Sequence, residues 1–128
     1  MKSVTALLAL ATLVGCDPTY PDTIELDALT SPPFGSKGSI TTNETLDSFH
    51  VNISVGVALA AGCWDSCYED ELCTVTAANP AVLGVRPLYR IGATGNQFVL
   101  VAQTAGATML HVETQCAARD YFVEIIGP

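Results

Sequence analysis

The fold of this chain is decided by one alternating run, His50-Val51-Asn52-Ile53-Ser54-Val55-Gly56-Val57-Ala58-Leu59-Ala60-Ala61-Gly62-Cys63. One face carries Val51, Ile53, Val55, Val57, Leu59, Ala61 and Cys63, and the other carries His50, Asn52, Ser54, Gly56, Ala58 and Ala60. Successive side chains of a β-strand point to opposite faces, so this period of two predicts a strand with one face in a core.

The chain after residue 63 contains shorter runs of the same kind. They cover residues 72–77, 82–85, 97–103, 108–114 and 121–126. Turn-forming residues separate them, namely Pro80, Pro87, Gly92, Gly95, Asn96 and Gly106. Short strands at regular spacing, with turns between them, predict an all-β fold. We expect a single antiparallel β-sandwich of about seven strands in residues 39–128.

Three short motifs resemble those of bacterial Ig-like (Big-type) domains. They are Ala78-Asn79-Pro80-Ala81-Val82-Leu83-Gly84-Val85, Ala105-Gly106-Ala107-Thr108-Met109-Leu110-His111-Val112 and Tyr121-Phe122-Val123-Glu124-Ile125. The resemblance spans roughly residues 40–127. The cysteine-rich insertion at 63–73 departs from the family, as does Phe98-Val99-Leu100-Val101-Ala102 in place of its Gly-x-Val-Thr-Ala run. The resemblance implies an Ig-like sandwich that serves adhesion, spacing or contact with glycans and proteins, and seldom catalysis.

The N-terminus has the layout of a secretory signal. Lys2 supplies a positive charge, and an apolar run follows that is too short to span a bilayer as a helix. Its end, Leu13-Val14-Gly15-Cys16, resembles the lipobox of bacterial lipoproteins. That resemblance implies cleavage after residue 15, diacylglycerol on the Cys16 sulfur and an acyl group such as palmitate on the new amine. A cut after Ala11, giving a soluble secreted protein, is the alternative.

Residues 16–38 differ from the segments on either side. This region contains six turn-forming residues, Pro18, Pro21, Pro32, Pro33, Gly35 and Gly38. Proline lacks the amide proton that a helix or central strand needs. Residues 23–29 alternate weakly and are compatible with an edge strand, but the segment as a whole is expected to be a tether between the lipid and the domain.

The net charge of the mature chain limits the kinds of partner that it can bind. Removal of Lys2 with the signal leaves 13 acidic residues and four of the five basic ones, a net charge of about −9 for the mature chain. So acidic a chain repels nucleic acid and anionic lipid headgroups, which we therefore do not expect as partners. The membrane contact is expected only through the lipid on Cys16, in the bacterial cell envelope at the outer membrane or the periplasmic face of the inner membrane.

The remaining four cysteines form an even set, as expected for disulfides in an exported protein. Cys63, Cys73 and Cys116 are expected near the ends of strands that meet at one pole of a sandwich. The preferred pairing is Cys63–Cys116 between the sheets with Cys67–Cys73 closing the acidic loop 63–73. The alternative is Cys63–Cys73 with Cys67–Cys116. The spacing does not match zinc knuckles, and the acidic residues of the loop match no EF-hand.

The sequence indicates no catalytic site and no cofactor. His50 and His111 lie on the polar phase of their strands, and no nucleophile elbow, zincin or P-loop motif occurs. Trp64 and Tyr68 in the cysteine-rich loop are the candidates for partner binding, because exposed aromatic residues often anchor interfaces. We therefore expect a non-enzymatic envelope module that binds a protein or glycan. A structural spacer or assembly subunit, and a membrane-tethered ligand carrier, are the alternatives.

Overall fold

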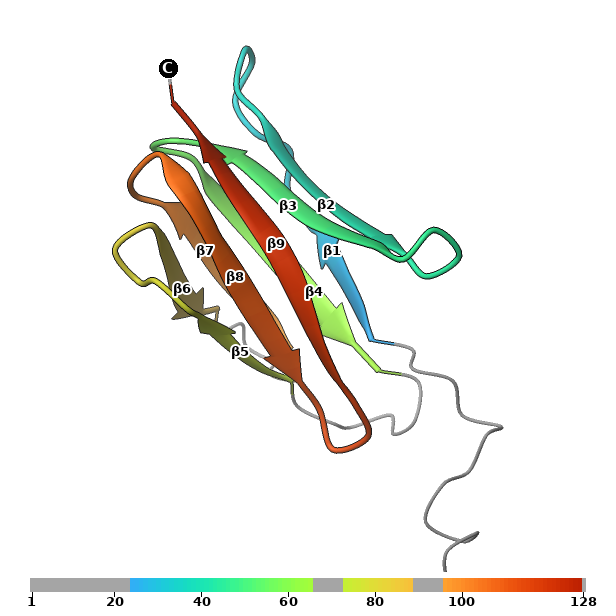
Figure 1. Ribbon diagram of the computed structural model, residues 1–128. Coiled ribbons are helices and arrows are strands. Elements are labelled where there is room, and N and C mark those ends of the chain that lie inside the picture. Colours follow the sequence, from blue (N-terminus) through green and yellow to red (C-terminus); the bar gives the residue numbers. More distant parts are fainter. Residues whose placement is uncertain (1–23, 66–72, 89–95, 128) are drawn as a thin grey trace, which may run out of the picture.

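The chain forms two stacked β-sheets, seen in a computed structural model that describes residues 24–65, 73–88 and 96–127 (Figure 1). The described residues form nine strands and no helix. The strands are β1 (Glu25–Ala28), β2 (Gly38–Asn43), β3 (Ser48–Ser54), β4 (Ala58–Trp64), β5 (Thr74–Ala77), β6 (Leu83–Pro87), β7 (Gln97–Ala102), β8 (Gly106–Glu113) and β9 (Ala118–Ile126). The all-β sandwich predicted from the alternating runs is confirmed.

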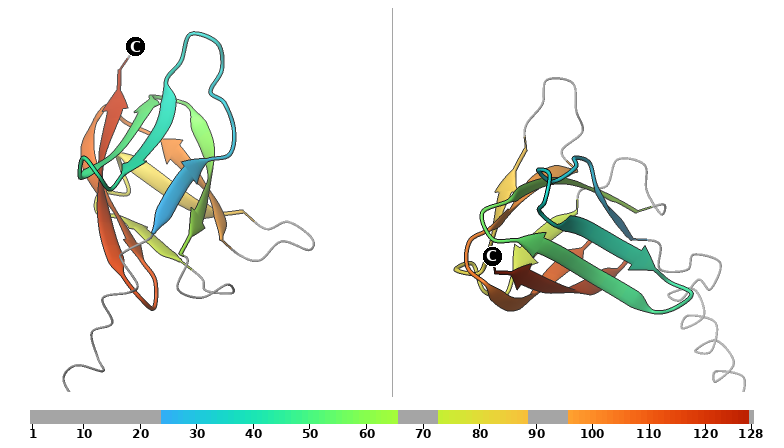
Figure 2. Two further views of the ribbon diagram at one scale, coloured as in Figure 1. Left: turned by 90° about the vertical axis from the view of Figure 1, so that its right-hand side faces the viewer. Right: turned by 90° about the horizontal axis from the view of Figure 1, so that it is seen from above.

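The order of strands is that of an immunoglobulin sandwich with one insertion. One sheet has the order β1-β4-β7-β6, and the other has the order β2-β3-β9-β8-β5 (Figure 2). The immunoglobulin pattern places strands A, B, E and D in one sheet and C, F and G in the other. Strands β1, β4, β7 and β6 occupy the first set of places, and β5, β8 and β9 occupy the second. Strand β3 pairs in parallel with β9, and β2 lies outside it as an added edge strand.

The long alternating run is two strands rather than one. Strand β3 ends at Ser54 and β4 begins at Ala58, and the two strands belong to different sheets. Gly56 lies between them with φ of 84°, a left-handed conformation that glycine adopts without strain. Val55 is exposed in this turn, although its phase placed it with the core residues. The number of strands is thus larger than the predicted seven.

The segment expected as a tether is part of the sandwich from residue 24 onward. Strand β1 pairs with β4, and Ile24 and Leu26 are fully buried. Strand β2 then starts at Gly38 and pairs with β3. The prolines lie between these two strands or before residue 24, so they do not interrupt either strand. The expected boundary between tether and domain, residue 38, is therefore too late.

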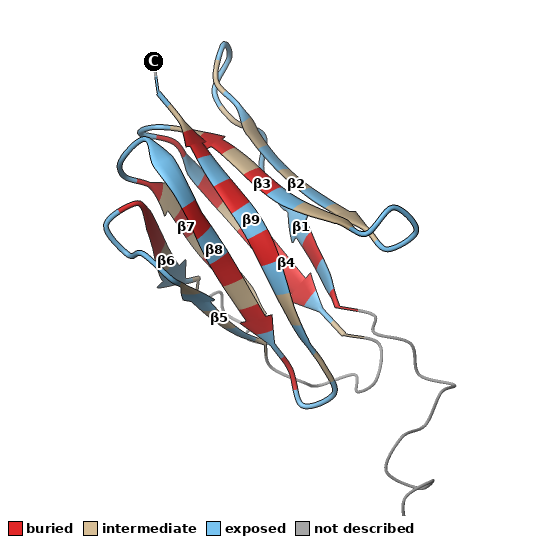
Figure 3. Ribbon diagram, in the orientation of Figure 1, coloured by how far each residue is buried: buried red, intermediate tan, exposed pale blue. Residues whose placement is uncertain are grey.

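The core lies between the sheets and consists of the inward side chains of both. Buried residues alternate with exposed or half-buried ones along β8 and β9, whereas Ala61, Gly62 and Cys63 at the end of β4 are all buried (Figure 3). The largest fully buried side chains are Tyr121, Ile24, Leu26, Ile53, Leu59, Leu83, Leu100 and Leu110. The later strands predicted from alternation agree with β5 to β9 within two or three residues at their described ends.

Candidate interaction surface

One end of the sandwich gathers the ends of strands from both sheets. We call it the disulfide pole and define it by Ile24, Trp64, Cys73, Asn96 and the β8–β9 turn 114–117. Glu25 of β1 pairs with Trp64 of β4, and Gly62 of β4 pairs with Gln97 of β7. The predicted meeting of cysteine-bearing strand ends at one pole is therefore seen for Cys63 and Cys73.

The disulfide at this pole joins Cys63 to Cys73, whose Cα atoms are 6.3 Å apart. Asn96 holds both residues, since its backbone oxygen accepts from the Cys63 amide at 2.9 Å and its side-chain oxygen accepts from the Cys73 amide at 3.2 Å. Because β4 and β5 lie in different sheets, the bond still links the two layers. The preferred pairing, Cys63 with Cys116, is wrong.

The reason for that error is the end of β8. Cys116 has the same phase as the inward residues Leu110 and Val112 and would point inward if the strand continued, but β8 ends at Glu113 and the chain turns. The Thr114 hydroxyl accepts from the amides of Cys116 and Ala117 at 3.2 and 3.1 Å, which fixes the turn and leaves Cys116 exposed. Cys116 is itself disulfide-bonded. Cys67, its partner in the alternative pairing, lies outside the described residues.

Trp64, one of the two predicted binding residues, lies at the end of β4 with 45% of its surface exposed. Its ring covers Gly62, where an added Cβ atom would meet the ring at 2.8 Å. The ring therefore packs along the outer face of its own strand. Tyr68, the other predicted residue, lies outside the described residues, as do most of the loop 63–73 and the whole segment with Cys16.

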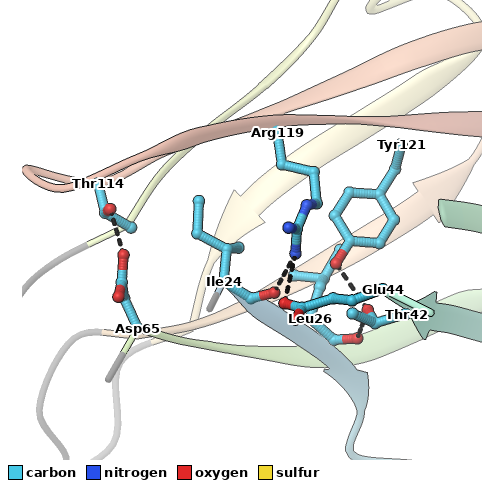
Figure 4. Close-up of polar contacts among 8 residues, drawn as sticks. All are labelled: Ile24, Leu26, Thr42, Glu44, Asp65, Thr114, Arg119 and Tyr121. Carbon is cyan, nitrogen blue, oxygen red and sulfur yellow. Dashed lines mark hydrogen bonds and ion pairs between the residues drawn. The ribbon is translucent and has the colours of Figure 1, made fainter. Parts of the chain in front are cut away.

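The chain also enters the sandwich at the disulfide pole. Ile24 precedes β1, and the side chain of Arg119 donates to its backbone oxygen at 2.6 Å (Figure 4). The pairing of Glu25 with Trp64 therefore places the start of β1 and the end of β4 at the same end of the sandwich.

Arg119 and Tyr121 fasten β1 from within the sandwich. The Arg119 side chain is 8% exposed, lies 4.2 Å from the centre of the Phe49 ring and is 3.4 Å from the Glu44 carboxylate. The Thr42 hydroxyl donates to the Leu26 oxygen at 3.2 Å and lies 2.6 Å from the Tyr121 hydroxyl (Figure 4). Burial raises the pKa of Tyr121 above its ordinary value, opposed by Thr42 and Arg119.

The outer face of the β1-β4-β7-β6 sheet is mostly apolar. Since Leu59, Ala61, Phe98 and Leu100 point into the core, their neighbours on the two central strands point outward. These outward residues are Ala58, Ala60, Gly62 and Trp64 of β4 and Gln97, Val99 and Val101 of β7. Leu29, which follows β1 and is 41% exposed, extends the same surface beside Ala60. We call this set of residues the apolar face.

The outer face of the other sheet is polar by comparison. Its outward residues include Thr41, His50, Asn52, Glu124, His111, Asp120, Glu113 and Thr76, with Met109 and Phe122 among them. His111 Nδ1 lies 2.7 Å from Asp120, and His50 packs against the Phe122 ring. Both histidines thus lie on the polar phase of their strands, as predicted. A sandwich surrounded by water on both sides would have polar residues on both outer faces, so the contrast sets the apolar face apart.

The described surface also contains two open hollows. Open hollows of about 400 and 490 Å³ lie away from the disulfide pole, beside Lys37, Ser54 and Ile126 in one case and Lys37, Asn52 and Glu124 in the other. Within residues 24–65, 73–88 and 96–127, no three His, Cys, Asp or Glu side chains are grouped as metal ligands. No helix in those segments could cross a bilayer.

No family model, curated protein or solved structure matches this chain. The apolar face was not predicted from the sequence, because Ala58 and Ala60 lie in the same phase as His50, Asn52 and Ser54, on the side opposite to the core residues. Val99 and Val101 in β7 could have revealed it. A strand with one solvent-exposed face normally carries polar residues at its outward positions, and these two are valines.

Proposed function

We propose that this chain is a lipid-anchored, non-catalytic module of the bacterial cell envelope that binds a protein partner through the apolar face. The observation that carries the proposal is the composition of the two central strands, whose outward positions hold Ala, Gly, Val and Trp with a single Gln. Exposed apolar patches of this kind mark protein interaction sites on soluble domains.

Trp64 supports the same surface from its edge. Its ring packs against Gly62 and still leaves a large aromatic surface exposed. Rigid aromatic residues lose little entropy when a partner covers them, which is why they often dominate the binding energy of an interface. A protein partner fits this flat face better than a glycan, because the face offers few hydrogen-bonding groups.

The anchor is proposed from the lipobox, and the fold then limits how far the domain can lie from the membrane. Residues 17–23 separate Cys16 from Ile24, the first residue that the structure describes, which is fully buried. Such a segment reaches at most about 29 Å when fully extended. A lipid on Cys16 therefore holds the disulfide pole near the bilayer, with the strands rising from it and the apolar face turned sideways, toward neighbouring molecules on the same membrane.

The anchor is tested with Cys16→Ala in the full-length chain. We expect the wild type to stay with the membrane fraction and to carry the mass of the lipid, and the variant to be recovered without either. Two acyl chains or more hold a protein on a bilayer almost permanently, so the difference is expected to be nearly complete. A wild-type protein without lipid, or a variant that stays equally membrane-bound, would contradict the anchor.

The binding surface is tested by photo-crosslinking in cells. A photoreactive residue replaces Ala58 on the apolar face, and a matched control replaces Ala107, which points outward from the polar face. We expect a defined protein adduct from position 58 and none from position 107. The absence of an adduct at position 58, or equal adducts from both positions, would refute the proposed surface.

A further inference from the structure

We infer that the partner of the apolar face is a second copy of this chain, related by a two-fold axis that runs parallel to the strands. The inference rests on the proposed function, that is, on the apolar face as the binding surface and on the anchor at Cys16. Two sheets that pack face to face keep their strands within about 30° of each other. A two-fold axis in the contact plane can then run along the strands or across them, and the two choices predict different contacts.

The charges at the two edges of the sheet favour the axis along the strands. Glu25 and Asp27 point outward from β1 at one edge, and Arg86 points outward from β6 at the other. An axis along the strands lays β1 of each copy over β6 of its partner, so opposite charges meet twice. An axis across the strands lays β1 over β1 and would bring the acidic edges together.

The levels of these charges agree with that arrangement. Arg86 pairs in register with Val99, which pairs with Ala60, so these three residues lie at the same height along the strands. Asp27 lies at the height of Gly62, with which it pairs. An axis along the strands keeps each level unchanged, so Arg86 of one copy lies two residues from Asp27 of its partner. Two residues of a strand span about 7 Å and packed sheets lie about 10 Å apart, so the two Cα atoms would be about 12 Å apart, a separation that extended arginine and aspartate side chains can bridge.

The shapes of the central strands are complementary in the same arrangement. Strand β4 of one copy then lies over β7 of its partner, at equal levels. Ala58 faces Val101, and Ala60 faces Val99, because these residues are already paired in register within one sheet. Small alanine side chains thus pack against larger valine side chains, as they do where two sheets interdigitate. Gln97 lies at the height of Gly62, which the Trp64 ring covers, and the amide of Gln103 lies over Gly84 at the β6 side of the same face.

The position of the anchor selects the same axis independently. Both copies point the same way when the axis runs along the strands, so both Ile24 residues lie at one end of the dimer. Two segments of seven residues can then reach one bilayer from that end. With the axis across the strands the two disulfide poles would point in opposite directions, and one of the copies could not reach the membrane.

A face of four short strands is small for a protein interface. Its strands are only four to seven residues long, so we expect the dimer to be weak in dilute solution. Anchoring in a membrane confines both copies and raises their effective concentration. We therefore expect reversible dimers that form mainly on the bilayer.

The first experiment swaps the charges at the two edges. Full-length protein is compared as wild type, Arg86→Glu, Asp27→Arg and the double variant, by sedimentation equilibrium in density-matched detergent. We expect each single variant to weaken the dimer by about tenfold or more, and the double variant to recover most of the loss. Thermal unfolding measured alongside shows that all four proteins are folded.

A matched pair of variants tests the centre of the face. Val99→Lys places a charge in the middle of the apolar face and is expected to abolish the dimer. Met109→Lys places the same charge at a central, outward and partly exposed position of the other sheet, and is expected to leave the dimer unchanged. Wild-type protein that stays monomeric at the highest concentration, or a double charge variant without recovery, overturns the inferred dimer.

The second experiment identifies the occupant in the membrane. With the photoreactive residue at position 58, an adduct of twice the chain mass that contains only this protein supports the second copy. An adduct with a different protein overturns the second copy and leaves the proposed binding face in place. The absence of any adduct overturns both. The failure of the inference and the failure of the proposed function are thus told apart.

Discussion

Tyr121 connects three strands through one phenol group. Its ring is fully buried and contacts the Phe49 ring edge-on, with centroids 5.7 Å apart. Its hydroxyl lies 2.6 Å from Thr42 of β2, and Thr42 donates in turn to Leu26 of β1. Buried hydroxyls need such partners, because an unsatisfied one costs roughly 1–3 kcal/mol. A tyrosine on the inward phase of β9 therefore requires β1 and β2 to lie close.

A pH titration tests this role of Tyr121. Its pKa is raised mainly by burial, so the folded protein holds this proton more tightly than the unfolded chain. The resulting stability is complete below the unfolded pKa of about 10 and is lost as the pH rises through the raised folded value. We expect wild type to lose stability with rising alkalinity more steeply than Tyr121→Phe, in urea unfolding at a series of pH values.

Tyr121→Phe also has an expected effect at neutral pH. The loss of one buried hydrogen bond is expected to cost about 1 kcal/mol. In an alkaline titration followed by phenolate absorbance, the variant is expected to lack the contribution of Tyr121, whose pKa is raised by burial. Equal alkaline profiles for the two proteins would show that the Tyr121 phenol is not protected by the fold.

Strand β1 shows what decides whether a short segment becomes a strand. Residues 25–28 alternate only weakly, and prolines precede and follow them. The strand forms because β4 offers it a free edge and the space between the sheets takes up Ile24 and Leu26. Arg119 adds a charge-assisted hydrogen bond to the start of β1. Contacts that are distant in sequence thus outweigh the local signal.

Arg119→Met is expected to loosen β1. The variant keeps an unbranched apolar side chain and removes the donor to the Ile24 oxygen, a loss of about 1–3 kcal/mol. Hydrogen exchange is expected to speed up more at the β1 amides than in β8. The control, Glu44→Gln, changes only a half-exposed partner 3.4 Å away and is expected to cost less than about 1 kcal/mol. Equal effects of the two variants would show that the Arg119 hydrogen bond to Ile24 does not hold β1 in place.

At the scale of the whole molecule, the Cys63–Cys73 disulfide joins the two sheets at the pole where the chain enters. The disulfide and the start of β1 therefore lie together. A pull on the proposed anchor acts first on β1, which is held by its pairing with β4, by Arg119 and by the buried side chains of Ile24 and Leu26.

Removal of this disulfide is expected to destabilise the protein substantially. The double variant Cys63→Ala/Cys73→Ala opens a loop with a sequence separation of 10, and closing a loop of this size contributes about 3 kcal/mol by restricting the unfolded chain. Chemical denaturation measures the loss. Peptide mapping without reduction is expected to give Cys63 linked to Cys73 and Cys67 linked to Cys116. A peptide that joins Cys63 to Cys116 would contradict the structure.

The sequence by itself determined the class of fold and most of the later strands. Alternation is a property of neighbouring residues along the chain, so β5 to β9 and the inward residues of β3 and β4 could be found without any knowledge of their partners. The polar phase of His50 and His111 followed from the same rule, as did the burial of Cys63.

Only the tertiary structure decided the rest. Val55 does not point into the core, because the chain turns at Gly56 from one sheet to the other. Cys116 does not point into the core, because β8 ends at Glu113. The Cys63–Cys73 pairing, the start of β1 at the disulfide pole and the apolar face all depend on which strands lie side by side. Strand neighbours are set by contacts between residues far apart in sequence, and a local period of two carries no record of them.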